Sequence, residues 1–174
     1  DAVLIGPGLM REEYTRDLTK RLLTKFPQKK WVLDAGSLQM MNPVWLKKLK
    51  NAIITPHKVE YEKLFSVSLF HCSIVNNLAM KQLNNVVFNK AKEYGCTIVL
   101  KGPTDIICSP NQCACDSQGN PGMTKGGTGD VLAGLIAALA CKNDLFLSGC
   151  AGVDCSTASA SANASSIDGK TALR

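Results

Sequence analysis

A glycine-rich run leads directly into a carboxylate in the segment Gly126-Gly-Thr-Gly-Asp130. Glycines let successive backbone N–H groups turn toward an anion, and a helix that begins there adds the positive end of its dipole. Such groups stabilise the negative charge that builds up on a transferring phosphoryl group. The Asp130 carboxylate, in the first turn of the helix, could take a proton from an attacking hydroxyl. The run alone fits a glycine turn equally well, with Asp130 merely favouring the helix dipole.

Two common nucleotide-binding motifs do not match this run. Lys125 precedes the glycines and no Gly-Lys-Ser/Thr follows, so the run is not a Walker A loop. The Gly-x-Gly-x-x-Gly spacing of a dinucleotide-binding loop after a strand is also absent. The chemistry therefore depends on what the rest of the chain places beside Asp130.

Short apolar runs alternate with helical stretches along the chain and must position these residues. We expect strands at residues 2–5, 31–34, 52–55, 97–100 and 105–108, the last two as a hairpin-like pair, with a polar loop at 109–120. We expect helices at residues 9–26, 42–50, 131–140 and 145–164, and a further helix that starts at Pro56-His57. Residues 66–94 are mostly helical but weakly defined, with an insertion or loop at 66–77 as the alternative. Strands that are apolar throughout, separated by helices, indicate a mostly parallel sheet covered on both faces. The prediction is an α/β layered fold in a single domain, residues 1–174.

Two of these helices have distinctive sequence signals. Asn42-Pro43 is typical of an N-cap followed by proline in the first turn. Residues 131–140 are apolar on every side, which predicts a helix buried in the core.

Polar residues follow several of the predicted strands. In parallel α/β folds ligands bind beyond the carboxyl ends of the strands, so these residues predict one polar cleft. They are Gly6-Pro-Gly8, Asp34, Thr55-Pro-His57 and Lys101-Gly-Pro-Thr-Asp105.

Each of these residues also has a structural interpretation. Thr55 could be an N-cap with His57 in the first turn, although the neighbouring motifs favour His57 as a ligand contact. Asp34 fits the binding of water or magnesium and hydrogen bonding to nearby amides equally well. Lys101 could be a surface charge, but Gly102 after it would allow a ligand to approach closely.

Composition excludes several classes of function. The chain has 174 residues and a net charge of +6, with 45% hydrophobic residues. No stretch approaches 18 consecutive apolar residues, which predicts no membrane span. The basic residues form no block with interleaved aromatics, which argues against nucleic-acid binding. No signal peptide is visible, so we expect a cytoplasmic protein, and the missing initiator Met suggests upstream sequence.

The chain has eight cysteines, at positions 72, 96, 108, 113, 115, 141, 150 and 155. Their spacing matches no zinc pattern, because Cys113-Ala-Cys115 has no second pair at a suitable distance. Several lie in apolar segments, where cysteine acts as a small hydrophobic residue. We therefore expect reduced thiols and no disulfide.

Residues 119–134, Gly-Asn-Pro-Gly-Met-Thr-Lys-Gly-Gly-Thr-Gly-Asp-Val-Leu-Ala-Gly, resemble the signature of the ADP-dependent NAD(P)H-hydrate dehydratases of the ribokinase-like superfamily. The shorter motifs of that family occur in the same order, and the resemblance covers nearly the whole chain. These motifs are Gly6-Pro-Gly-Leu9, Asp34-Ala35, Thr55-Pro-His57 with Glu60, and Lys101-Gly102. The resemblance also implies that the N-terminal part of the domain, with further strand–helix units, lies outside this chain. Without those units the sheet edge would be unpaired and the substrate site incomplete.

The family repairs hydrated NADH and NADPH by phosphorylating the ring hydroxyl from ADP, or ATP in some members, after which phosphate is eliminated. The resemblance implies ADP or ATP as phosphoryl donor, with Mg²⁺ on the phosphates. Asp130 would be the catalytic base, in an anion hole of Gly126, Gly127, Thr128 and Gly129. Hydrated NAD(P)H would contact Gly8, His57 and Asp130. The nucleotide would contact Lys101, Gly102, Pro103, Thr104, Asp105 and Gly129.

The chain departs from the family pattern at three positions. Met10 replaces a glycine, so the helix after the first turn is expected to begin earlier. Val59 stands where glycine is common. Asp105 stands where a hydroxyl is common, and an anion there would repel a phosphate ester.

Two other functions fit the same residues. A ribokinase-like kinase of a vitamin precursor or sugar would share the anion hole and the base but keep its phosphorylated product. A non-catalytic fragment would keep the loop but need a partner chain. For the enzyme itself we expect a homo-oligomer.

Overall fold

A six-stranded sheet forms the centre of the molecule, seen in a computed structural model that describes residues 1–69, 77–117 and 126–168, without side chains for 77–79 and 158–168. The strands lie in the sheet in chain order: β1 (Ala2–Ile5), β2 (Lys30–Leu33), β3 (Asn51–Ile54), β4 (Thr97–Leu100), β5 (Asp105–Cys108) and β6 (Cys113–Asp116). The first four strands are parallel, whereas β5 pairs antiparallel with β4 and β6 pairs antiparallel with β5. The predicted mostly parallel sheet, including the hairpin-like pair, is confirmed.

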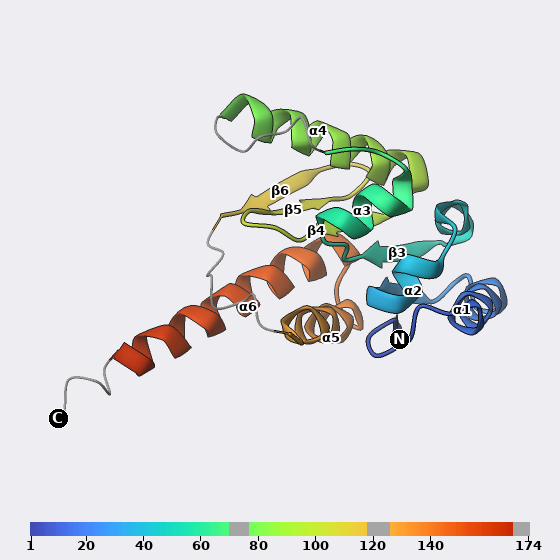
Figure 1. The fold of residues 1–174 in the computed structure, drawn as a ribbon, viewed down its shortest axis with the longest axis horizontal. Helices are drawn as coiled ribbons and strands as arrows, with labels where there is room; N and C mark the ends of the chain where they lie inside the picture. Colours follow the sequence, from blue (N-terminus) through green and yellow to red (C-terminus); the bar gives the residue numbers. More distant parts are fainter. Residues whose placement is uncertain (70–76, 118–125, 169–174) are drawn as a thin grey trace.

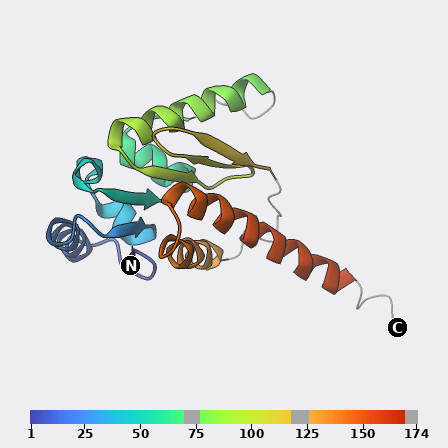
Figure 2. The same ribbon diagram turned by 180° about the vertical axis from the view of Figure 1, so that it is seen from behind.

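Helices cover both faces of the sheet (Figure 1). They are α1 (Glu13–Lys25), α2 (Ala35–Met40), the 3₁₀ helix η1 (Pro43–Lys48), α3 (Lys58–Phe65), α4 (Asn77–Tyr94), α5 (Thr128–Ala140) and α6 (Leu145–Asp168). The helices α5 and α6 lie together on one face, and the view from behind shows α3 and α4 on the other (Figure 2). No helix within the described ranges is long and apolar enough to cross a membrane.

Alternating side chains of the buried strands pack into two separate hydrophobic cores, one on each face of the sheet. In β2, Trp31 and Leu33 pack with α1 to α4, while Val32 packs with α5 and α6. In β4, Ile98 and Val99 divide in the same way. Both sets are buried because successive residues of a strand point to opposite faces, and both faces are covered.

Two elements were missed by the sequence prediction. Strand β6 lies in the segment predicted as a loop, because Cys113-Ala-Cys-Asp116 has a weak strand composition and pairs with β5 only in the folded hairpin. The six-residue helix α2 begins directly after Asp34, where the sequence showed no period long enough to detect.

Three predicted helices differ in detail. Helix α1 begins at Glu13, later than predicted, and Met10 does not start it early because residues 6–9 form a turn closed by the Leu9 N–H and the Gly6 carbonyl (3.0 Å). The Asn42 cap is confirmed, since its side chain accepts from the Val44 N–H, but the helix is a 3₁₀ helix. Helix α5 is buried on one face only, and Val131 is 69% exposed.

The loops after β1 and β2 cross each other at two glycines. A Cβ on Gly6 would lie 1.7 Å from the Asp34 carbonyl oxygen, and a Cβ on Gly36 would lie 2.1 Å from the Leu9 carbonyl oxygen. Any side chain at either position would collide with the backbone of the other loop. This crossing fixes Gly8 and Asp34 at the same edge of the sheet.

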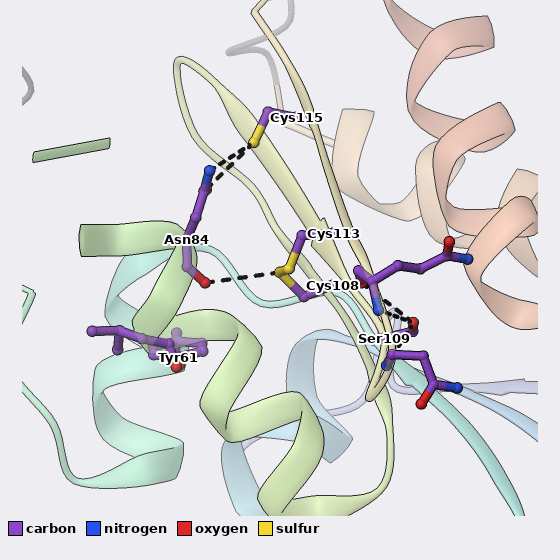
Figure 3. The surroundings of a disulfide bond; sticks show 9 residues. Tyr61, Asn84, Cys108, Ser109, Cys113 and Cys115 are labelled. Carbon is purple, nitrogen blue, oxygen red and sulfur yellow. Dashed lines mark hydrogen bonds between the residues drawn. A yellow bond between two sulfur atoms is a disulfide. The ribbon is translucent and has the colours of Figure 1, made fainter. Parts of the chain in front are cut away.

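A disulfide joins Cys108 and Cys113 across the β5–β6 hairpin (Figure 3), so the prediction of reduced thiols is wrong for these two residues. The turn between the strands sets them directly opposite, with Cα atoms 4.1 Å apart. The spacing of cysteines along the chain does not encode the strand register that pairs Cys108 with Cys113. Cys96 remains a thiol in the core, and burial raises its pKa to about 12, so it acts as a hydrophobic residue.

Candidate functional site

The first turn of α5 presents backbone amides beside Asp130. Gly127 is the N-cap, and its φ of 93° favours glycine. The Val131 N–H donates to the Gly127 carbonyl (3.1 Å), so the amides of Gly129 and Asp130 precede the first intrahelical bond. Asp130 lies in this first turn, as the sequence predicted, and its side chain is exposed. Lys125 and the rest of the motif back to Gly119 lie outside the described residues.

A buried ion pair joins the ends of two strands beside this turn. The Lys101 Nζ lies 2.9 Å from the Asp34 Oδ1, and the Asp34 side chain is only 2% exposed. The same Nζ lies 3.4 Å from the position that a Cβ on Gly129 would occupy. The ammonium group therefore lies against the start of α5. Asp34, Lys101 and Gly129 are thus brought together from three separate segments.

His57 caps helix α3. Its Nδ1 accepts from the Glu60 N–H (3.3 Å), and the Glu60 carboxylate accepts from the His57 N–H (2.9 Å), which makes a capping box. The cap is therefore His57 and not Thr55. The His57 side chain remains 50% exposed. The backbone of His57 pairs with that of Lys101 in an isolated parallel β-bridge. His57 thus has a structural role, while its predicted contact with the substrate stays a prediction.

Glu60 holds this part of the site together. Its carboxylate is buried and also accepts from the Gln39 Nε2 (2.6 Å), which ties α3 to α2. No such role was predicted for Glu60. The spacing of a cap residue followed three positions later by glutamate was the available signal.

The segment Lys101 to Asp105 turns back on itself. The Asp105 carboxylate accepts from the Gly102 N–H (2.8 Å), which closes the loop between β4 and β5. Burial, with Asp116 opposite it on β6, raises the pKa of Asp105. Asp105 is therefore used within the loop, and its contact with a nucleotide, like those of Pro103 and Thr104, stays a prediction.

Gly8 lies in the turn after β1 with φ of 74°, and among the described residues no atom beyond its chain neighbours lies within 4 Å of where its Cβ would be. The turn thus presents bare backbone at the carboxyl edge of the sheet. Its predicted contact with the hydrated cofactor is not tested by this geometry.

Magnesium would fit here as a nucleotide complex. Among the described residues, no group of three or more His, Cys, Asp or Glu side chains could hold a metal ion. Mg²⁺ usually keeps several waters and binds through substrate phosphates with one or two carboxylates. A site that offers backbone amides, one ammonium and the Asp130 carboxylate is compatible with that mode.

A separate hollow of about 590 Å³ lies at the opposite edge of the sheet. It is lined by the amino ends of β2, β3 and β4 and by the turn of the β5–β6 hairpin. It contains none of the predicted site residues, so the carboxyl edge remains the candidate site.

The fold and this edge together define a ribokinase-like α/β protein. A ribokinase-like superfamily protein from Enterococcus faecalis superposes with a TM-score of 0.67 at 26% identity, over 87% of this chain and 51% of that one. The chain belongs to the NAD(P)H-hydrate dehydratase family, whose model matches residues 1–173.

Individual relatives agree with this assignment. The chain is 36% identical over 152 residues to a bifunctional NAD(P)H-hydrate repair enzyme from Methanocaldococcus jannaschii, covering 87% of this chain and 27% of that protein. It is 37% identical over 145 residues to an ADP-dependent (S)-NAD(P)H-hydrate dehydratase from Nitrosopumilus maritimus, covering 82% and 47%. An ADP/ATP-dependent NAD(P)H-hydrate dehydratase from Bacillus subtilis, co-crystallized with ATP/Mg²⁺, superposes with a TM-score of 0.71 at 28% identity, over 90% and 53%. The chain thus spans between about a quarter and a half of the length of these relatives.

Proposed function

We propose that the protein containing this chain is an ADP-dependent NAD(P)H-hydrate dehydratase, a carbon–oxygen lyase that repairs hydrated NADH and NADPH. One observation carries the proposal beyond family membership. The first turn of α5 places the Asp130 carboxylate in the same turn as Gly129, and the Lys101 ammonium lies against that glycine. A base, the backbone amides of a helix N-terminus and a positive charge at one point are what phosphoryl transfer to a hydroxyl requires.

In the proposed reaction, the Asp130 carboxylate takes the proton of the hydroxyl on the hydrated nicotinamide ring. The hydroxyl oxygen bonds to the terminal phosphorus of ADP, and the bond from that phosphorus to AMP breaks. The phosphate ester then leaves the ring as inorganic phosphate while a neighbouring ring carbon loses a proton, which restores the double bond. The products are NAD(P)H, AMP and phosphate.

Each group of the site has a proposed part in this reaction. The amides of Gly126 to Gly129 would hold the negative charge of the transferring phosphoryl group. The segment Lys101 to Asp105, with Gly129, would bind the nucleotide, and Gly8 and His57 would contact the hydrated cofactor. When bound, Mg²⁺ would supply further positive charge on the phosphates.

The test uses the full-length protein that contains this chain, with hydrated NADPH, ADP and Mg²⁺. We expect recovery of the absorbance of reduced nicotinamide. Asp130→Asn should lower kcat by about 10²- to 10⁴-fold, because the amide cannot accept the hydroxyl proton. Asp17→Asn, an exposed position on α1, serves as the charge-matched control and should leave the rate unchanged. Failure of the wild-type protein to restore absorbance, or full activity of Asp130→Asn, would contradict the proposal.

Two alternatives are separated by further measurements. A kinase of a vitamin precursor or sugar would convert ADP or ATP and accumulate a phosphorylated product, which mass spectrometry would detect. A non-catalytic fragment would bind no ADP in calorimetry unless a partner chain were added. A single domain over residues 1–174, a homo-oligomer and a cytoplasmic location stay predictions, which limited proteolysis, light scattering and cell fractionation would test.

A further inference from the structure

The buried ion pair at the carboxyl edge links strands that are not neighbours. Asp34 follows β2 and Lys101 follows β4, with β3 between them in the sheet. The Lys101 side chain is 20% exposed and that of Asp34 is 2% exposed. Burying a carboxylate in an ion pair gains little net stability over apolar packing, because both charges must lose water. A contribution to stability is therefore a poor explanation for the pair.

The Asp34 side chain does not cap the helix that begins directly after it. It is the N-cap residue of α2, where aspartate usually accepts a hydrogen bond from the helix amides, but its side chain makes no such bond. Its carboxylate turns instead to the Lys101 Nζ at 2.9 Å. The backbone geometry that aims it there is fixed by the crossing of the two loops, at which the Asp34 carbonyl lies against Gly6.

The Lys101 ammonium group has more N–H donors than its bond to Asp34 uses. An ammonium carries three N–H donors, and within the described part of the chain Asp34 is the group that accepts from Lys101 Nζ. The Nζ lies 3.4 Å from the Cβ position of Gly129, against the α5 turn that also holds Asp130. The remaining donors are available to a ligand that approaches this turn.

We propose that Asp34 is a positioning residue: its buried carboxylate holds the Lys101 ammonium at the start of α5, where it binds the phosphates of a nucleoside diphosphate. The inference rests on the proposed function for the identity of the nucleotide. It assigns Asp34 no contact with the substrate. Its effect passes through Lys101, so the two residues must act as one unit.

The test measures ADP binding by calorimetry and steady-state kinetics on the full-length protein. Asp34→Asn, which keeps the shape but removes the charge, should weaken ADP binding at least about 10-fold, because the ammonium loses its anchor. The KM for hydrated NADPH should stay unchanged. Asp34→Asn combined with Lys101→Met should bind ADP no more weakly than Lys101→Met alone, since one unit is lost once. Lys92→Met, at an exposed position on α4, should bind ADP normally.

Three results would overturn the inference. They are unchanged ADP affinity in Asp34→Asn, additive losses in the double variant, and full recovery by added Mg²⁺, which would make Asp34 a direct metal ligand. A purely structural role would lower the melting temperature and raise both KM values together. If Asp34→Asn does not fold, Lys101→Met carries the test, and wild-type ADP affinity in that variant would refute the inference. Because binding is measured apart from turnover, a protein that binds ADP but repairs no NADPH would contradict only the proposed function.

Discussion

Asp105 carries a partly buried charge at the open end of the β5–β6 hairpin. Burial, and to a lesser degree the Asp116 charge opposite, raises its pKa, which means that the folded protein binds a proton there more tightly than the unfolded chain. Where the folded state binds more protons, stability falls as the pH rises. The ionised carboxylate is therefore destabilising above the raised pKa, and this penalty disappears below the unfolded pKa.

We expect Asp105→Asn to stabilise the protein at neutral pH by up to about 1 kcal/mol. The asparagine oxygen can still accept from the Gly102 N–H, while the buried charge is gone. The gain should vanish near about pH 3, below the usual aspartate pKa. Urea unfolding at both pH values checks this, with the exposed Asp17→Asn as control. A gain at acidic pH that is absent at neutral pH would contradict the assignment.

A residue's place in the structure was predictable where its neighbours in the chain mark the start of a helix or strand. Asp130 follows directly on the glycines that start its helix, so its place in the first turn was predictable. The partner of Asp34 was not, because Lys101 lies 67 residues away and only the folded sheet brings the two together. The sequence left magnesium binding and amide contacts as equal interpretations of Asp34, and the structure shows an ion pair.

At the scale of elements, the segments that follow β1 and β2 pack closely against each other. The backbone of each loop occupies the space that a side chain on the other would need, at Gly6 and at Gly36. The crossing lets the Gly36 N–H donate to the Gly6 carbonyl (3.3 Å). These contacts hold the backbone of Asp34 against the turn after β1.

We expect Gly36→Ala to destabilise the protein by about 1–3 kcal/mol, because the new Cβ would lie 2.1 Å from the Leu9 carbonyl oxygen. The melting temperature should fall by roughly 2–4 °C for each kcal/mol. Gly134→Ala on α5 is the matched control, because no atom of the described residues outside the backbone of its own helix turn lies within 4 Å of the Cβ position. It should be neutral or stabilising, since alanine favours a helix more than glycine does. Equal melting temperatures for Gly36→Ala and wild type would refute the close crossing.

Element boundaries show where local signals end. The parallel strands were predicted to within one residue, because fully buried strands are continuous apolar runs bounded by polar residues. Strand β6 was missed since its residues alternate between exposed and half-buried, and neither its composition nor its length separates it from a loop. Its pairing with β5, and the disulfide between Cys108 and Cys113 within that pair, follow from the turn geometry.

At the scale of the whole molecule, one lysine connects the sheet to the far end of α5. The Lys30 Nζ donates to the carbonyls of Ala140 and Asn143, each at 2.8 Å. Ala140 is the last residue of α5 and Asn143 lies in the turn that follows, so the ammonium is at the carboxyl end of the helix, where a positive charge is favourable. The same helix carries Asp130 at its other end, so Lys30 helps to hold the helix that bears the candidate base.

We expect Lys30→Met to cost about 1–3 kcal/mol, because it removes two hydrogen bonds from a charged donor and leaves the carbonyls without them. Lys29→Met is the control and should change stability by no more than about 1 kcal/mol, since the Lys29 side chain pairs, among the described residues, only with the exposed Asp1 at 3.5 Å. Chemical denaturation of both variants measures the difference. Equal stabilities for the two variants would show that the Lys30 contacts contribute nothing.

The sequence by itself determined the layered α/β fold and the place of Asp130 in the first turn of a helix, because apolar periodicity and glycine punctuation act between residues close in the chain. Tertiary structure alone decided the pairing of Asp34 with Lys101, the disulfide across β5 and β6, and the exposed side of α5. Each of these depends on which segments the sheet sets side by side. A local sequence pattern does not encode contacts between segments far apart in the chain. Those contacts form when both faces of the sheet are buried under helices.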